Sequence, residues 1–367
     1  MNQELLYQLS LALVPNVGDV HARILMQHFG SASAIFKAPL FTLEKLEGIG
    51  SVRARSIKLF RNFEQAESEI AFLEKFNIRK IFIDDDDYPK RLFHCYDAPV
   101  LLFHKGMANL NTSKIIGIVG TRNASEYGRT VTEKLIQDLA GLDILIISGL
   151  AVGIDAIAHK ASIKNNLPTV GVIGHGLDNL YPYENTSLAK EMVKNSGGLL
   201  TEFFSGTKPD KHNFPLRNRI VAGLCDALIV IETNVKGGSM ITAKLADSYH
   251  RDIFAVPGKV TDNKSSGCNY LIRKNKAMMI TCADDLIEMM GWQENKIKPK
   301  KQRELFHEFS EAEKNIIKFL EENGMKSIDE LNGNCNLTSS ETAAAILNLE
   351  LNGIIESLPG KIYRLMH

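Results

Sequence analysis

The chain has 367 residues, of which 44% are hydrophobic, so it can form two or three domains with cores of ordinary size. Lysine plus arginine and aspartate plus glutamate number 43 each, which excludes a basic field over the whole molecule; any site for a polyanion must be local. The sequence does not open with a signal-peptide pattern, and no apolar run reaches the length of a membrane span, so we expect a cytoplasmic protein without membrane contact. The five cysteines are scattered without a C-x-x-C pair, which indicates buried thiols rather than disulfides or a metal site.

Residues 1–78 are predicted to form a helical domain of the helix-hairpin-helix or SAM-like kind. In the stretch 43–57, LEKLEGIGSVRARSI, apolar residues recur at helical spacing on both sides of a G-I-G turn. The glycines permit a tight hairpin, and the amides that open the second helix can donate to a phosphate oxygen. A weaker copy of the pattern lies at 13–18. Such a hairpin either contacts a DNA backbone, with Arg53 and Arg55 assisting, or only packs helices together, and the sequence leaves both possibilities open.

Residues 79–291 are predicted to form a Rossmann-like domain whose core is 112–291. The core repeats one unit, an apolar strand followed by a glycine-bearing loop and an amphipathic helix, which indicates a doubly wound parallel sheet covered by helices on both faces. The predicted strands are 114–120, 143–149, 169–174, 198–204, 227–233, 253–258 and 277–281. Ahead of them, two strand-like runs flank four aspartates, 84–87, whose neighbours do not match a calcium loop, so we expect a solvated turn there.

Two strand ends carry phosphate-binding features, because ligands of a doubly wound sheet bind beyond the carboxyl ends of its strands. The first strand ends in Gly120-Thr121-Arg122, which places a guanidinium beside a helix N-terminus. The fifth end predicts a second phosphate-binding nest at a helix N-terminus, formed by Gly237, Gly238 and Ser239. Neither G-x-G-x-x-G nor G-x-x-x-x-G-K-[ST] occurs, which argues against dinucleotide and ATP chemistry.

A short basic run, 208–219, precedes the apolar segment IVAGLCDALIVIET. One acid, Asp210, is outnumbered there by four cations, Lys208, Lys211, Arg217 and Arg219. We predict a cation-rich loop at the ligand-binding edge of the sheet, where it can hold phosphates. The alternative is a solvated charged face. Phe214, within the run, can support a base or anchor the loop.

Four further polar or aromatic residues lie near strand ends, where each could have a structural or a binding role. Asp155 is predicted to cap the helix after the second strand. His159, one turn further on, is predicted to pack in the interior, because no carboxylate or cysteine completes a catalytic set. Tyr181 and Tyr183 end the loop after the third strand, and either can stack on a base or pack within the loop.

Several motifs in a fixed order carry a family resemblance. They read V-G-T-R-N-A-S-x-Y-G, S-G-L-A-x-G-I-D-x-x-A-H, G-H-G-L-D-x-x-Y-P, F-P-x-R-N-R-I-x-A-G-L, G-G-S-x-I-T-A-x-x-A and F-A-V-P-G. Together they resemble the DNA-processing protein A (DprA/Smf) family over residues 88–290. Members often carry an N-terminal helix-hairpin-helix-like domain and a C-terminal winged-helix-like domain.

The resemblance implies a protein that binds single-stranded DNA without catalysis. Such a protein shields incoming DNA during natural transformation and loads the recombinase RecA onto strands coated by single-strand-binding protein. It further implies a homodimer formed through the Rossmann-like domain, and neither a cofactor nor a metal. The DNA pocket of the family falls, position by position, on Gly120, Thr121, Arg122, Lys211, Phe214, Arg217, Asn218 and Arg219.

The C-terminal part is predicted to be a polar, basic linker, 292–309, and a winged-helix-like domain, 310–367, with a hairpin turning at Pro359-Gly360. The third helix of this domain contains Glu341 and Glu350 and no lysine or arginine. A recognition helix without cations is a poor reader of a DNA groove, so we expect a protein-contact or regulatory domain.

Two other functions remain as alternatives. Similar sheets occur in nucleoside 5′-monophosphate phosphoribohydrolases, whose P-G-G-x-G-T-x-x-E loop supplies a glutamate that helps cleave the glycosidic bond. The corresponding loop here, 236–243, contains no glutamate. A nucleotide-sensing module would need only the strand-end loops, but the helix-hairpin-helix pattern and the basic run argue against it.

Overall fold

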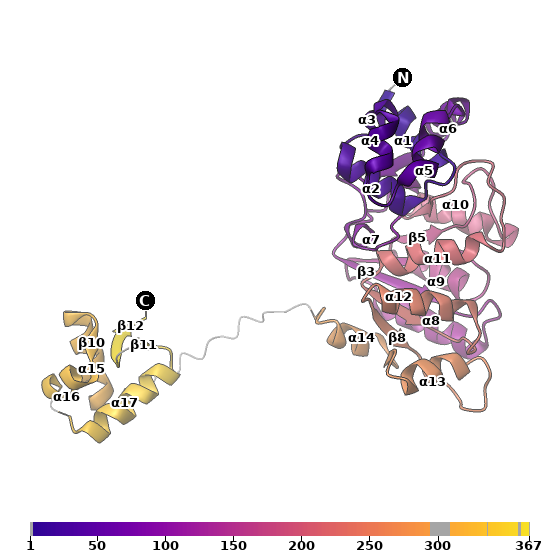
Figure 1. The fold of residues 1–367 in the computed structure, drawn as a ribbon. Helices are drawn as coiled ribbons and strands as arrows, with labels where there is room; N and C mark the ends of the chain where they lie inside the picture. The colour runs from indigo at the N-terminus through magenta and orange to yellow at the C-terminus, as the bar shows by residue number, and fades with distance from the viewer. Residues whose placement is uncertain (1–2, 294–308, 336, 359–360, 367) are drawn as a thin grey trace. The chain divides into compact units, whose positions relative to one another are not determined.

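The computed structural model describes residues 3–293, 309–335, 337–358 and 361–366. The chain divides into two compact units, Met1–Trp292 and Gln293–His367 (Figure 1). The predicted linker, 292–309, lies outside the described residues except at its two ends. Among the helices that the structure describes, none is long and apolar enough to cross a membrane.

The first unit opens with the predicted helical region, which Figure 1 shows in indigo at one end of the unit. Its helices are α1 (Gln3–Leu13), α2 (Asp19–Phe29), α3 (Ala32–Lys37), α4 (Leu40–Lys45), α5 (Gly50–Leu59) and α6 (Phe63–Phe76). The predicted hairpin joins α4 to α5, and its glycines, Gly48 and Gly50, have φ of 83° and 65°, which favours glycine. Ala54 and Ile57 are buried on α5, as the helical spacing predicted.

A nine-stranded sheet follows, in the order β1-β2-β6-β5-β4-β3-β7-β8-β9. The strands are β1 (Arg79–Phe82), β2 (Leu101–Gly106), β3 (Lys114–Val119), β4 (Ile144–Ser148), β5 (Thr169–Val172), β6 (Gly198–Thr201), β7 (Ala227–Val230), β8 (Asp252–Ala255) and β9 (Met278–Met279). All seven predicted strands, β3 to β9, are present and run parallel. The two earlier strand-like runs join the same sheet as β1 and β2, which pair antiparallel at its edge.

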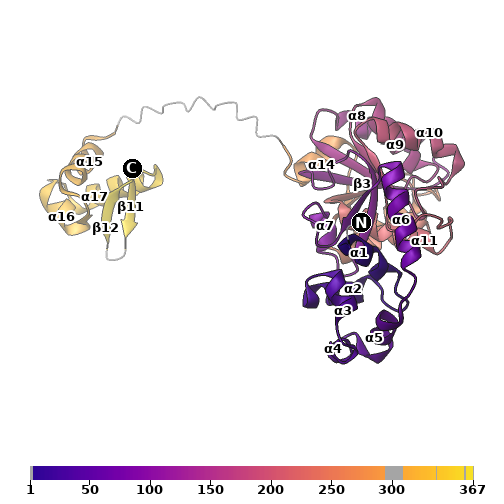
Figure 2. The same ribbon diagram turned by 90° about the horizontal axis from the view of Figure 1, so that it is seen from above.

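Alternating strand residues divide the core into two layers, because successive side chains point to opposite faces. On β3, Ile116 and Ile118 pack with α8 (Glu126–Asp138), α9 (Ile154–Lys164) and α14 (Ala283–Met289). Ile115 and Val119 belong to the layer that contains α11 (Asn213–Leu224) and α12 (Gly238–Ser248). Figure 2 shows α8 and α9 on the other side of β3 from α11. The doubly wound prediction is therefore confirmed. The remaining helices of the unit are α7 (Lys90–Phe93), α10 (Thr186–Lys194) and α13 (Ser266–Arg273).

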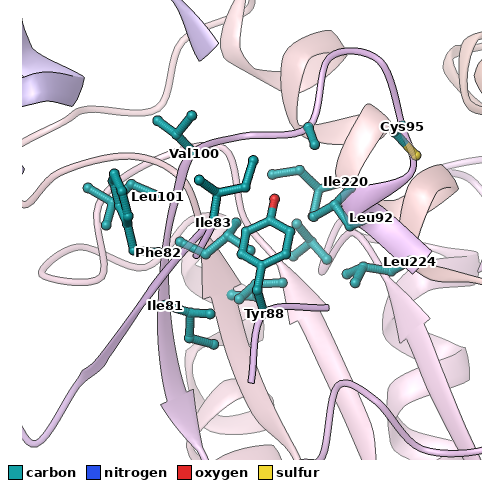
Figure 3. Packing of buried hydrophobic residues seen from close by; sticks show 14 of the residues in the cluster. Ile81, Phe82, Ile83, Tyr88, Leu92, Cys95, Val100, Leu101, Ile220 and Leu224 are labelled. Atoms are coloured by element: carbon teal, nitrogen blue, oxygen red, sulfur yellow. The ribbon is translucent and has the colours of Figure 1, made fainter. Parts of the chain in front are cut away.

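Helix α11 packs on apolar residues of the segment 81–101, which precedes the parallel strands. Ile220 and Leu224 of α11 lie against Tyr88 and Leu92 in one buried cluster (Figure 3). The Tyr88 hydroxyl donates to the Pro99 carbonyl at 2.5 Å, so its polar atom is paired inside this core. Burial raises the pKa of Tyr88 well above its usual range. This buried packing therefore holds α11 in position against the rest of the unit.

The second unit has the predicted winged-helix order. It consists of α15 (Glu311–Asn323), β10 (Lys326–Ser327), α16 (Ile328–Asn334), α17 (Ser339–Leu351), β11 (Ile355–Leu358) and β12 (Ile362–Leu365). Its three strands pair antiparallel in the order β10-β12-β11. The predicted turn at Pro359-Gly360 lies outside the described residues. Buried residues of α15, α17, β11 and β12 form its core.

Candidate nucleic-acid interface

A cavity of about 550 Å³ lies where the strand order of the sheet reverses. The chain runs outward from β3 through β4, β5 and β6, then returns to place β7 on the other side of β3. Loops after β3, β4 and β7, together with the start of α11, line the cavity. Such a switch point is where doubly wound sheets bind ligands. Ten of the eleven predicted site residues line it: Gly120, Thr121, Arg122, Lys211, Phe214, Arg217, Asn218, Gly237, Gly238 and Ser239.

The loop after β3 is held by a carboxylate from the loop after β7. The Thr121 amide donates to the Glu232 carbonyl at 2.7 Å, and the Ser125 amide donates to Glu232 Oε2 at 2.9 Å. Ser125 caps α8, because its hydroxyl accepts from the Gly128 amide at 3.1 Å. Arg122 is exposed on this fixed loop, with its guanidinium 5.7 Å from the centre of the Phe214 ring.

The loop after β7 ends at the N-terminus of α12, as the predicted phosphate nest requires. Gly238 and Ser239 open the helix, so their amides have no acceptor within it. The Ser239 hydroxyl donates to Thr233 Oγ1 at 2.7 Å, which directs this side chain inward. A Cβ on Gly238 would meet no atom within 4 Å, so the space in front of the helix is open. An anion can therefore approach the positive end of this helix dipole.

The basic run is not a single loop, which corrects the prediction from the sequence. Helix α11 begins at Asn213, and Pro215 lies in its first turn, where a proline is tolerated because it needs no amide donor. Lys211 precedes the helix and is exposed at the cavity. The two arginines of the run therefore lie on the helix, where residues two positions apart point about 200° away from each other.

Arg217, predicted to neutralise a phosphate, lines the cavity but is buried, with only 5% of its surface exposed. Its Nη1 donates to the carbonyl of Gly149, the residue after β4, and to the carbonyl of Val172, the last residue of β5. Burial lowers the pKa of Arg217 to about 10, although the carboxylate of Asp155 opposes that shift. A Cβ on Gly149 would meet the guanidinium, so only glycine fits above it. Arg217 thus ties the loop after β4, which lines the cavity, to the end of β5.

Arg219 does not line the cavity, which corrects its assignment to the site. It is 8% exposed, and its guanidinium donates to the Asp97 carbonyl, to Glu202 and, at 3.0 Å, to Asp19 of the N-terminal helices. Burial raises the pKa of Glu202 to about 7, and the positive charge of Arg219 limits that rise. Arg219 therefore joins α11 to α2 rather than binding a ligand.

Asp155 and His159 also have interior roles. Asp155 is the second residue of α9 rather than its cap, and Oδ2 accepts from the amides of Gly149 at 3.2 Å and Ala151 at 3.3 Å. Burial raises the pKa of Asp155, while Arg217 lowers it. The interior packing predicted for His159 is confirmed, because the ring is fully buried. Its Nδ1 lies 2.6 Å from Thr169 Oγ1, and burial lowers the pKa of His159 to about 3.

The four aspartates form a turn whose charges are partly paired. Asp85 lies 3.0 Å from Lys80, and Asp87 lies 3.0 Å from Arg79. In the described part of the chain, no group of three or more histidine, cysteine, aspartate or glutamate side chains could hold a metal ion.

The region that contains the switch-point cavity matches a known protein family. Residues 79–291 match the family described as DNA recombination-mediator protein A. The chain belongs to this family. Its flanks match the helix-hairpin-helix motif over 5–70 and the DprA winged helix domain over 299–361.

Relatives in the DprA family span all or part of the chain. Protein Smf of Synechocystis sp. is 31% identical over 99% of both chains. DNA processing protein DprA of Streptococcus pneumoniae is 43% identical over 55% of this chain and 71% of its own. The X-ray structure of the S. pneumoniae protein superposes with a TM-score of 0.66 and 32% identity, covering 78% of this chain and 98% of that one. DNA processing protein A of Helicobacter pylori, solved to explain its single-stranded DNA binding mode, gives a TM-score of 0.54 and 30% identity over 59% and 97%.

Sequence reasoning missed three polar residues that line the same cavity in this DprA-family chain. Thr233 and Asn234 lie in the loop between β7 and α12, and Thr242 lies one turn into α12. For Thr233 and Asn234 a signal was available, because ligands of a doubly wound sheet bind beyond the carboxyl ends of the strands at the switch point. Asn234 is exposed, and its side chain accepts from the Lys236 amide at 3.1 Å, which shapes the approach to α12.

Proposed function

We propose that the protein binds single-stranded DNA in the switch-point cavity and does not cut it. The observation that carries the proposal is the joint placement of Lys211, Arg122 and the open N-terminus of α12 around one cavity. Cationic side chains and helix amides are the groups that proteins offer to phosphates. The formal charge of the whole chain is zero, so this local concentration of donors supplies the attraction.

Phe214 favours single strands over duplexes. Its ring is partly exposed at the cavity, with the guanidinium of Arg122 above it. An aromatic ring can stack on an unpaired base, whereas duplex bases are already stacked on each other. The structure of the H. pylori relative addresses its single-stranded DNA binding mode, which supports single-stranded DNA as the ligand.

The proposal includes a role in recombination. The chain belongs to the family of DNA recombination-mediator protein A, and this membership supports the proposed role. In that role the protein loads RecA, during natural transformation, onto single strands that are coated by single-strand-binding protein. We further propose that the protein acts as a homodimer formed through the Rossmann-like region. RecA nucleation on coated strands, with and without the protein, tests the loading step; unchanged nucleation would remove it while leaving DNA binding in place.

Binding is tested by competition between labelled oligo-dT and either single-stranded or duplex competitors. Single strands should compete at much lower concentration than duplex, and Arg122→Ala or Lys211→Ala should each bind oligo-dT more weakly. Equal competition by duplex would contradict the choice of ligand. Incubation with adenosine monophosphate tests the phosphoribohydrolase alternative, in which release of adenine would establish an enzyme.

A further inference from the structure

A second, smaller cavity of about 60 Å³ adjoins the first. Arg122, Phe214 and Arg217 line both cavities, while Tyr181 and Pro182 line only the smaller one. Phe214 therefore stands between the two. A DNA strand that left the first cavity past Phe214 would therefore reach the smaller cavity, which Tyr181 lines.

Tyr181 extends the aromatic surface of Phe214. The two ring centres are 6.1 Å apart and the rings are tilted by 32°, so they contact each other. Tyr181 is nevertheless 46% exposed, which leaves much of its ring open to solvent. Arg122 lies 5.7 Å from the Phe214 ring centre. A cation and two aromatic rings thus form one continuous surface beside the cavity.

The loop that carries Tyr181 is anchored in the interior. The Tyr181 amide donates to His175 Nε2 at 3.3 Å, and Nδ1 of the same ring lies 3.0 Å from the Gly176 carbonyl oxygen. His175 is 1% exposed, and the Asn185 side chain donates to the Leu150 carbonyl at 2.9 Å. A fixed loop presents the Tyr181 ring without the ordering cost that a mobile one would pay on binding.

We propose that Tyr181 is a second base-stacking position of the single-stranded DNA site, next to Phe214. This inference rests on the proposed function and names a residue that extends it. A base between the two rings would need about 7 Å, twice the contact distance of stacked carbon atoms. Because the ring centres are only 6.1 Å apart, the base stacks on the open face of Tyr181. Stacking tolerates every base, so this position adds affinity without sequence preference.

The test compares Tyr181→Ala with the parent on two oligonucleotides, oligo-dT and an abasic strand of equal length that keeps every phosphate. Tyr181→Ala should bind oligo-dT about 5- to 140-fold more weakly, the range expected for loss of one stacked base. On the abasic strand it should match the parent. Its dependence of affinity on salt should also match the parent, because no phosphate contact is lost.

Two further variants provide controls. Tyr181→Phe keeps the ring and should bind oligo-dT like the parent. Tyr183→Ala removes a ring that is 75% exposed on the same loop but lines neither cavity, and it should have no effect. Parent-like binding of oligo-dT by Tyr181→Ala, or an equal loss on the abasic strand, would overturn the stacking role. A parent protein that binds neither oligonucleotide would overturn the proposed function itself.

Discussion

Arg217 and Arg219 project from opposite sides of α11 and have different partners. Arg217 donates to the carbonyls that end β4 and β5, beneath the cavity, whereas Arg219 pairs with Glu202 and with Asp19 of α2. One short helix therefore organises the cavity on one side and attaches the N-terminal helices on the other. Of the basic run, Lys211, just before the helix, is both exposed and at the cavity, where the exposed Arg122 of the loop after β3 also lies.

Replacement of Arg219 by leucine should destabilise the protein with little effect on DNA binding. The change leaves Glu202 and Asp19 without their cation, and breaking a buried ion pair in this way costs roughly 3–5 kcal/mol. Urea unfolding measures the loss, and Lys208→Leu, at an exposed cation of the same run, should stay within about 0.5 kcal/mol of the parent. An Arg219→Leu protein that unfolds like the parent but no longer binds oligo-dT would return Arg219 to the binding site.

Gly238→Asp should stabilise the fold while it weakens DNA binding. A carboxylate in the first turn of α12 interacts favourably with the helix dipole, by about 0.3–1 kcal/mol, and the position has room for a side chain. The same charge repels a phosphate at the helix N-terminus. Thermal unfolding and oligo-dT titration measure the two effects. Gly238→Asn, which matches the side chain in shape without its charge, should bind more tightly than Gly238→Asp; equal binding by the two would show that no phosphate lies there.

The contribution of His159 to stability should depend on pH. Burial lowers its pKa to about 3 in the folded protein, below the value near 6.5 of the unfolded chain. The unfolded state therefore binds the proton first, so the contribution is complete above pH 6.5 and falls as the pH drops toward 3. The difference in free energy of unfolding between the parent and His159→Gln should shrink by about 1.4 kcal/mol for each pH unit below about 6. Carboxylates titrate in both proteins and cancel; a difference that is constant between pH 4 and 7 would contradict the buried neutral ring.

The layout of the sheet could be predicted because the parallel strands are continuous apolar runs, and most of them are followed by a glycine-bearing loop. That pattern also located the residues of the cavity, since Gly120 and Gly237 follow β3 and β7. The antiparallel pairing of β1 and β2 with this sheet could not be predicted, because nothing local in their sequences specifies which edge they join.

The burial of Arg217 and Arg219 could not be predicted, because it depends on where α11 begins. The run 208–219 was predicted to be a loop, but α11 begins within it, and Pro215 in the first turn is compatible with the helix. Once the helix starts at Asn213, its periodicity directs Arg217 and Arg219 to opposite sides. Their buried partners, the Gly149 carbonyl and Glu202, come from distant strands that the basic run itself does not reveal.

The most direct test of the account is the salt dependence of oligo-dT affinity for the parent and for the double variant Arg122→Ala/Lys211→Ala. Each lost phosphate contact on a single strand lowers the log–log slope by about 0.7, so the double variant should bind more weakly with a slope smaller by about 1.4. Lys164→Ala, which removes an exposed cation at the far end of α9, should match the parent. A double variant with the parent's affinity and slope would contradict the assignment of DNA to the switch-point cavity.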